Sequence, residues 1–369
     1  MQCHKENYYL KNFLNKRSTK KKEEISQFIQ EHFENMIRSK YVGPIELDDN
    51  EFKDIILTDA CFLFELFSLT CEGKRPGDYI FSTPLLLYWT KKDLVMFENQ
   101  IPLSFLQNLY DFTNPKSSHP WSFLELSMKF FQLKIPSDHL DGIKHFTDLY
   151  RRSWLPKENF KSHYRTNFYD LRYTATKLDK AGVDFAPPPP KEDSTPLTRV
   201  RVSQQGWRWC KFIPCLNSLK LQLPVLEIQN NTECFLLNVM IMEQCQPDLQ
   251  SKTPICSYIW LMDKLINTEE DVELLVEKKV ISHCLESNMA VVNMINKLPK
   301  NIYVENFIYN DECKPLNEFY ERWYNRAKET LKRVYFKDLW TASSTCVAGL
   351  VVLFTAISAI ESLKSMLGN

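Results

Sequence analysis

Acidic side chains gather at one point of the chain and could, by type, bind a cation. The cluster consists of Asp48, Asp49, Asn50, Glu51 and Asp54. A calcium loop needs oxygen ligands at alternating positions around a central glycine, and this run has no such glycine. Because acidic residues near the start of a helix are stabilised by its dipole, the run predicts a charged helix N-terminus.

Histidine and cysteine could supply a nucleophile and its base, or the ligands of a metal. The chain has 7 histidines and 11 cysteines, and its most closely spaced cysteines, Cys210 and Cys215, are too far apart for a CxxC pair. Zinc ribbons and redox motifs are therefore unsupported, and scattered thiols suit a reducing compartment. His283 and Cys284 are neighbours, but adjacent residues on a strand or helix point apart.

Two further polar groups have a structural explanation. The adjacent carboxylates Glu269 and Glu270 point apart for the same reason. The run Glu98-Asn99-Gln100 stands beside apolar residues, where hydrogen-bonded structure is commoner than a binding site. We therefore assign no catalytic, cofactor-binding or metal-ligating residue from the sequence and expect no cofactor.

Composition argues against several classes of function. Glycine is scarce, with 8 in 369 residues, and GxGxxG, GxxxxGK[ST] and GxSxG are all absent from the sequence. Phosphate loops and nucleophile elbows need these glycines for their tight turns. Lys plus Arg equals Asp plus Glu, 46 each, so no overall field attracts nucleic acid. We expect neither a nucleic-acid partner nor a small-molecule ligand.

The body of the chain reads as packed helices. Apolar residues recur at helical spacing from Ile25 to Ile37, and Phe52 to Leu69 is dense in Ile, Leu and Phe. Thr232 to Cys245 predicts another helix. Thr268, with Asp271 three residues later, forms a capping-box pattern that predicts a helix from Glu269 to Lys279.

A small sheet and a linker divide the chain. Arg199 to Val202 and Leu219 to Leu223 alternate between apolar and polar residues, as strands do. The proline-rich segment 186–196 predicts a linker. The sequence thus predicts a mainly α fold with a small antiparallel β-sheet, made of a helical part at 1–185, the linker, and an α+β part at 197–339.

The tail is the most informative segment for location. Twenty residues from Thr341 to Ile360 carry no charge, and at 1.5 Å per residue they could reach across the roughly 30 Å apolar core of a bilayer. They predict a C-terminal transmembrane helix. The alternative is a buried terminal helix, because only Cys346 to Ile360 is strongly apolar. An amphipathic helix is expected to lead into the tail; its apolar face is Phe319, Trp323, Ala327, Leu331 and Val334.

Charges beside the tail predict an orientation. Upstream basic residues outnumber those downstream, where Lys364 stands alone. The upstream set is Arg322, Arg326, Lys328, Lys332, Arg333 and Lys337. Since basic residues stay on the cytoplasmic side of a membrane, the bulk of the chain is expected to be cytoplasmic. The polar N-terminus lacks the apolar core of a signal peptide.

Six stretches, in order, resemble the plant family called domain of unknown function 247. They are Phe52 to Phe67, Met96 to Leu106, Ala175 to Phe185, Leu221 to Cys245, Ser257 to Leu285, and the tail with Tyr335, Phe336 and Trp340. The resemblance implies a mainly helical plant membrane protein with one C-terminal anchor and no established activity or catalytic residues. Members usually carry a longer N-terminal region, which this chain is expected to lack.

Together these observations favour a tail-anchored, non-catalytic recognition or signalling protein at the plasma membrane. Its expected partners are the membrane, through Thr341 to Ile360, and another protein. The alternative is an enzyme of unrecognised type that acts near the membrane. A third hypothesis is a soluble protein whose tail packs inside.

Overall fold

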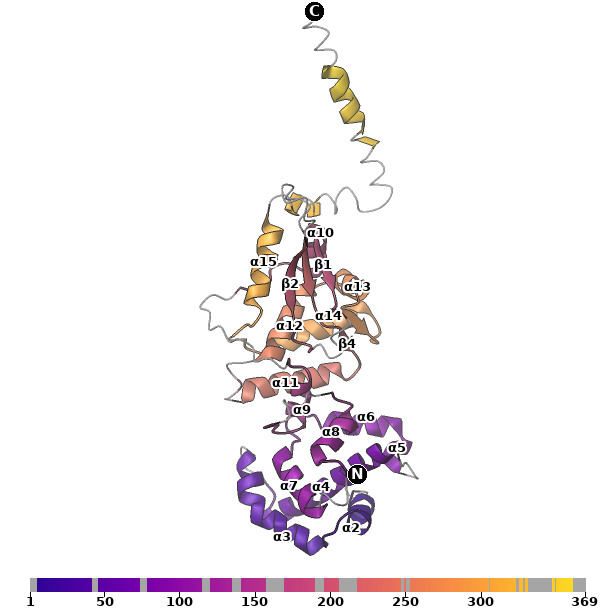
Figure 1. Cartoon of the computed structure of the whole chain (residues 1–369), viewed down its shortest axis with the longest axis vertical. Helices are drawn as coiled ribbons and strands as arrows, with labels where there is room; N and C mark the ends of the chain where they lie inside the picture. Colours follow the sequence, from indigo (N-terminus) through magenta and orange to yellow (C-terminus); the bar gives the residue numbers. More distant parts are fainter. Residues whose placement is uncertain are drawn as a thin grey trace, which may run out of the picture.

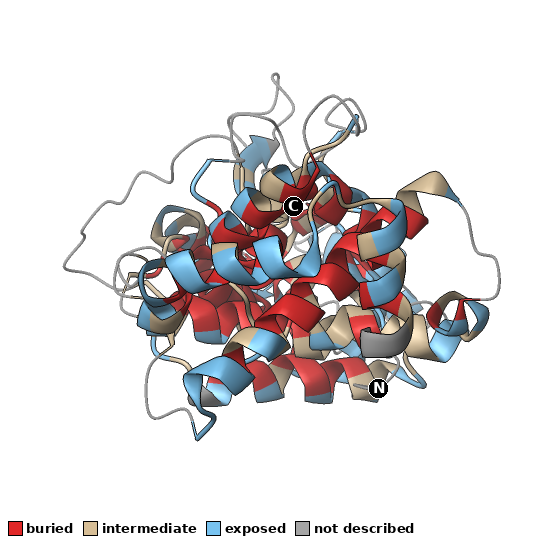
Figure 2. Cartoon of the chain, turned by 90° about the horizontal axis from the view of Figure 1, so that it is seen from below, coloured by how far each residue is buried: buried red, intermediate tan, exposed pale blue. Residues whose placement is uncertain are grey.

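The computed structural model describes most of the chain, with gaps. The described residues are 5–41, 46–73, 78–114, 120–134, 141–156, 169–189, 196–205, 218–246, 249, 253–304, 306–322, 325–327, 329–330, 347–348 and 350–360. Buried apolar side chains form one continuous cluster from Tyr9 to Tyr320. Seen from below in Figure 2, the buried residues run through the middle of the molecule and the exposed ones cover its outside.

Helical segments follow one another through the N-terminal half. They are η1 (Lys5–Leu10), α2 (Lys11–Lys16), α3 (Lys22–His32), η2 (Phe33–Ile37), η3 (Arg38–Lys40), α4 (Asp49–Glu72), α5 (Tyr79–Ser82), α6 (Pro84–Asp93), α7 (Leu103–Thr113), α8 (Phe123–Phe131) and α9 (Phe146–Ser153). In Figure 1, α2 to α8 gather at the lower end of the molecule. The helices predicted around Ile25 and over Phe52 to Leu69 are confirmed as α3 and α4.

α4 lies at the centre of this half because it is apolar on nearly every side. From Ile56 to Leu69 almost all of its side chains are buried. The Phe67 ring stacks on Phe130, with centroids 4.3 Å apart. The helix ends at Gly73, whose φ of +66° is a left-handed conformation that glycine adopts without strain.

One acidic side chain lies inside this apolar core, where an arginine compensates its charge. Glu65 is almost fully buried on α4, and its carboxylate accepts a hydrogen bond from the Arg17 guanidinium. Arg17 Nη1 also lies 2.5 Å from the carboxylate of Glu72, about two turns further along α4. The cation ties the end of α2 to α4 and compensates for burying Glu65.

Two small sheets lie in the C-terminal half. Their strands are β1 (Val183–Ala186), β2 (Arg201–Gln205), β3 (Ser218–Gln222), β4 (Leu226–Ile228) and β5 (Ile281–His283). β3 is the middle strand of the first sheet: β1 pairs with it in parallel, with Val183 opposite Leu219, and β2 pairs with it antiparallel. β4 and β5 form a parallel pair.

Helices pack around these sheets. They are α10 (Ala175–Ala181), α11 (Thr232–Cys245), α12 (Pro254–Leu265), α13 (Glu269–Glu277), α14 (Asn288–Lys297), η6 (Leu298–Asn301) and α15 (Asn310–Glu321). α11 and the capping box of α13 are confirmed as predicted. In Figure 1, α9 and α11 lie between the lower helices and the upper, sheet-containing half.

The predicted transmembrane helix is wrong. Among the residues that the structure describes, no helix is both long and apolar enough to cross a membrane. Residues 350–360 are helical, but eleven residues rise only about 16 Å, roughly half of a bilayer's apolar core. Thr341 to Cys346 lie outside the described residues.

Two other predictions need correction. The small sheet is mixed rather than antiparallel, because β1 joins it in parallel from the N-terminal side of the proline-rich segment. The helix expected to lead into the tail is interrupted: α15 ends at Glu321, where Arg322 turns to an extended conformation. Ala327 belongs to a separate short helical stretch, and Trp323, Leu331 and Val334 lie outside the described residues.

The helices and strands do not test the predicted division of the chain into parts at 1–185, 186–196 and 197–339. Residues 190–195 of the expected linker lie outside the described residues. The boundaries at 186–196 stay a prediction.

Candidate functional site

A buried polar network lies where α9 meets α11. α9 is amphipathic: Phe146, Leu149 and Tyr150 enter the apolar core, while Asp148 and Arg151 are buried on its polar face. Two side chains cap its first turn. The Phe146 N–H donates to Gln100 Oε1 at 3.0 Å, and the Asp148 N–H donates to His145 Nδ1 at 3.3 Å.

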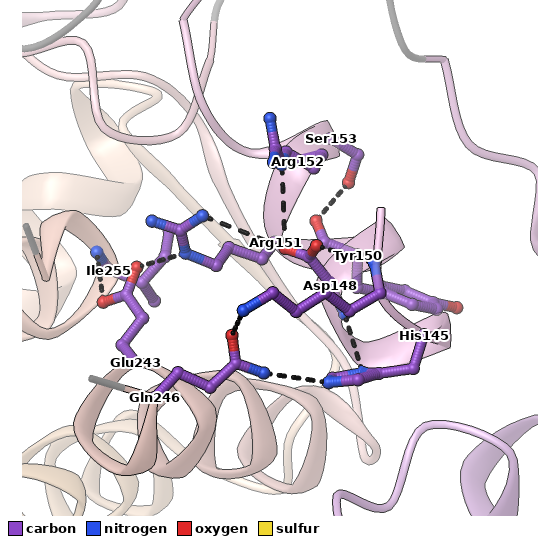
Figure 3. Close-up of polar contacts among 10 residues, drawn as sticks. His145, Asp148, Tyr150, Arg151, Arg152, Ser153, Glu243, Gln246 and Ile255 are labelled. Carbon is purple, nitrogen blue, oxygen red and sulfur yellow. Dashed lines mark hydrogen bonds and ion pairs between the residues drawn. The ribbon is translucent and has the colours of Figure 1, made fainter. Parts of the chain in front are cut away.

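Arg151 and Glu243 form the centre of the network (Figure 3). Arg151 Nε donates to Glu243 Oε1 at 2.8 Å, and both side chains are buried. The residues are 92 positions apart, one on α9 and one on α11. A buried pair of this kind holds two helices in one relative position, because separating the charges would leave each without a partner.

Glu243 also caps the next helix. Its second oxygen, Oε2, accepts the N–H groups of Ile255 and Cys256 at 3.0 and 3.1 Å, in the first turn of α12. These are donors that a helix start leaves unpaired. Burial raises the pKa of Glu243, whereas Arg151 and the Cys256 N–H favour the charged form. One carboxylate therefore joins α9, α11 and α12.

His145 completes the network at the start of α9. Its Nε2 lies 3.1 Å from the Gln246 side-chain amide at the end of α11, and Lys144 Nζ donates to the oxygen of that amide at 3.1 Å. Figure 3 shows the His145 and Gln246 side chains pointing toward each other. Burial lowers the pKa of His145 to about 4, so its imidazole is neutral at pH 7.

This arrangement suits structural support better than bond-breaking chemistry. The nearest thiol, Cys256, is buried, and burial raises its pKa, so it resists forming the nucleophilic thiolate. No group of three or more potential metal ligands occurs among the described residues. The expectation of a non-catalytic protein stays a prediction.

The polar groups singled out in the sequence do not converge on this network, apart from one. Gln100 contributes through its cap on α9, and its Nε2 donates to the carbonyls of Leu94 and Met96. That hydrogen-bonded role is the one expected for the run from Glu98. Asp48 caps α4, as predicted for the acidic cluster, by accepting the N–H groups of Asn50 and Glu51.

The other candidates lie elsewhere. His283 Nε2 is 2.9 Å from Asn288 Oδ1 beside β5, and Cys284 is exposed. Glu269 and Glu270 are exposed in the first turn of α13. Their neighbour Asp271 is buried, and it accepts hydrogen bonds from α10 as well as from its own helix start.

Sequence reasoning missed Arg151 and Glu243. A faint signal was present, since Glu243 is a lone acid at the end of the apolar run from Phe235 to Met242. A buried acid requires a cationic or hydrogen-bonding partner. The partner is 92 residues away, so no local pattern could identify it.

A cavity of about 500 Å³ lies beside α9, lined by residues other than those of the network. Its walls come from α6, α8, α9, β4 and the start of α11. Tyr150, Ser153 and Trp154 line it from the α9 side, and Lys91 contributes a cation. The cavity offers space for a ligand among the described residues.

The tail helix is a second candidate surface. Every described residue from 347 to 360 is exposed. Large apolar side chains predominate; they are Val347, Leu350, Val351, Val352, Leu353, Phe354, Ile357 and Ile360. In Figure 1 this helix, drawn in yellow, stands apart from the rest of the molecule. A helix that is apolar all round normally lies in an apolar environment.

Comparison with known proteins assigns the chain to a family. The family described as plant protein of unknown function, DUF247, matches residues 1–354. A UPF0481 protein of Arabidopsis thaliana is 27% identical over 367 residues, covering 91% of this chain and 73% of the relative. A putative UPF0481 protein of the same plant is 25% identical over 142 residues, covering 38% of this chain and 26% of that relative. No solved structure matches the chain significantly.

Proposed function

We propose, on the premise that this chain belongs to the DUF247 family of plant proteins of unknown function, that it is a non-catalytic recognition protein that works at a lipid surface. The tail helix contacts lipid, and the folded body binds another protein. The proposal requires only that the helix contacts lipid; it does not require a segment that spans the membrane.

The observation that carries the proposal is the uncovered apolar surface of the tail helix. Leu353 and Phe354 expose 60% and 67% of their surface. Burying one such side chain gains about 1.5–3 kcal/mol, and contiguous exposed apolar surface of this kind typically marks an interaction site. A helix that sinks into the acyl-chain boundary of a bilayer can bury more of its apolar surface than a narrow groove on a protein would cover.

Charge near the tail supports the same partner. Six basic residues lie between Arg322 and Lys337. The cytoplasmic leaflet of the plasma membrane is anionic, and each basic residue near it contributes about 1 kcal/mol of attraction. We therefore propose the cytoplasmic face of the plasma membrane as the location of the protein.

Flotation with lipid vesicles tests this proposal. The full chain is expected to float with vesicles of phosphatidylcholine and phosphatidylserine, and the double variant Leu353→Asp/Phe354→Asp is expected to remain at the bottom of the gradient. The matched control is Val276→Asp/Met289→Asp, which places the same charges at exposed apolar positions of α13 and α14.

The control is expected to float like the unmodified chain. Failure of the unmodified chain to float with any of these vesicles would refute the proposal. Equal flotation of both double variants would also refute the role of the tail helix. Circular dichroism of each variant verifies that the body is folded.

A face of α6 is the proposed contact for a partner protein. Leu85 and Trp89 lie four residues apart, on one side of the helix, and expose 61% and 43% of their surface. Lys92 lies over the Trp89 ring, 4.8 Å from its centroid. An exposed aromatic residue beside a cation suits a partner with an apolar segment and a nearby carboxylate.

Proximity labelling in plant cells tests this contact. Partners labelled by the unmodified chain are expected to be lost with Leu85→Asp/Trp89→Asp and retained with Val276→Asp/Met289→Asp. An identical set of labelled proteins for all three chains contradicts the proposed contact.

A further inference from the structure

We propose that the cavity beside α9 binds a small amphipathic carboxylate, with its acid group at Lys91 and its aromatic or alkyl body against the aromatic wall. This ligand site goes beyond the proposed function, and no sequence motif predicts it.

The size and walls of the cavity suit such a ligand. A volume of about 500 Å³ falls within the range of small-molecule sites, roughly 300–1,000 Å³. Aromatic side chains from three parts of the chain line the cavity. They are Phe131 of α8, Tyr150 and Trp154 in and just after α9, and Phe235 of α11. An apolar body is favoured there because the rings would cover it from water.

Lys91 has no acidic partner among the residues that the structure describes. Lys91 is half-buried, and among the described residues no carboxylate forms a salt bridge with it. Its Nζ lies 5.3 Å from the centroid of the Phe130 ring. Because Lys91 is half-buried, its charge is partly removed from water, and this burial lowers the pKa of Lys91. A carboxylate at Nζ would replace the missing solvation with a charge-assisted hydrogen bond.

The rest of the lining favours a single anionic group. Gln132, Gln229 and Asn231 add amide groups, and the first turn of α11 faces the cavity with the positive end of its dipole. Glu227 also lines the cavity, but its side chain is on the exposed side of β4, where water screens its charge. One lysine, without an arginine, suits a monocarboxylate better than a polyphosphate.

Calorimetric titration of the full chain tests the inference with a matched pair of probes. The probes are 3-phenylpropionate and its neutral analogue 3-phenylpropanamide. We expect the carboxylate to bind at least tenfold more tightly than the amide, because only the carboxylate pairs with Lys91. The affinity of the carboxylate is expected to fall as the pH rises toward the lowered pKa of Lys91.

Two variants and a control separate the charge from the cavity. Lys91→Met is expected to abolish the tenfold preference for the carboxylate. Lys92→Met removes the neighbouring cation, which stacks on Trp89 and does not line the cavity, so the preference should persist. Val225→Trp adds bulk at an exposed position of the lining and should weaken binding of both probes.

Three results would overturn the inference. The two probes could bind with equal affinity, Lys91→Met and Lys92→Met could lose the preference for the carboxylate to the same extent, or neither probe could bind at millimolar concentration. Thermal unfolding of each variant confirms that the fold persists. Vesicle flotation of Lys91→Met should match the unmodified chain. The ligand site and the lipid contact can therefore fail independently.

Discussion

α4 and the tail helix are both apolar on nearly every side, yet they have opposite environments. α4 is wrapped by other helices, with Phe67 in contact with rings of α8 and α9. No side chain of the described residues covers the tail helix, and Phe354 exposes 67% of its surface. Apolar composition thus specifies that a helix needs cover, and the fold decides whether the protein itself provides it.

The difference is also visible in charge. α4 carries Glu65 inside its apolar surface and begins at the capping residue Asp48. The described residues 347–348 and 350–360 contain no ionisable side chain. A buried helix can include an acid where the protein supplies a cation, as Arg17 does for Glu65. A helix that lacks cover from the protein has no such support.

The largest expected effect comes from truncating matched rings in the two helices. Phe67→Ala should lower the free energy of unfolding by about 4 kcal/mol, because it leaves a cavity among packed rings. Phe354→Ala should change it by less than about 0.5 kcal/mol, because this ring is exposed. Urea denaturation followed by circular dichroism measures both, and similar losses would show that the tail helix is packed.

A somewhat smaller effect is expected from removing the cation beside α4. Arg17→Met should cost about 3 kcal/mol, because it leaves the Glu65 carboxylate buried without its partner. Adding Glu65→Gln should recover much of that loss, since the amide is neutral. The matched control is Lys20→Met, which removes one side of the exposed Lys20–Glu24 pair and should leave the urea midpoint unchanged. An unaltered midpoint in Arg17→Met would contradict the role of the pair.

The smallest of the three effects is the pH dependence of stability that His145 causes. The described tail residues have no ionisable side chain and contribute no such dependence. The pKa of His145 is about 4 in the folded protein and near 6.5 when unfolded. The unfolded chain therefore binds more protons between these values, and stability is lost as the pH falls from 6.5 toward 4.

Between pH 7 and pH 5 the contribution of His145 to this loss is about 2 kcal/mol. The variant His145→Asn should flatten the pH dependence by that amount, and asparagine can still accept the Asp148 N–H. His32→Asn, on α3, serves as the control and should retain the dependence of the unmodified chain. The same slope in all three proteins would show that the pKa of His145 is the same in the folded and the unfolded chain, as it would be if the imidazole reached water.

Local patterns predicted much of the helical framework. The apolar run from Phe52, the segment from Thr232 and the capping pair Thr268 and Asp271 each depend on neighbours within a few positions, and α4, α11 and α13 follow them. The parallel strand β1 was missed because its partner, β3, lies more than thirty residues further along the chain. Pairing at that distance leaves little trace in local alternation.

The sequence by itself determined that the chain is mainly helical, where several of its helices start, and that its tail is apolar and uncharged. These features follow from side-chain size, periodicity and capping, which act over three or four residues. Only the tertiary structure decided that Arg151 meets Glu243, that α9 borders both a polar network and a cavity, and that α4 is covered while the tail helix is exposed. Those outcomes depend on which distant segments pack together, and burial and charge pairing exist only once that packing has formed.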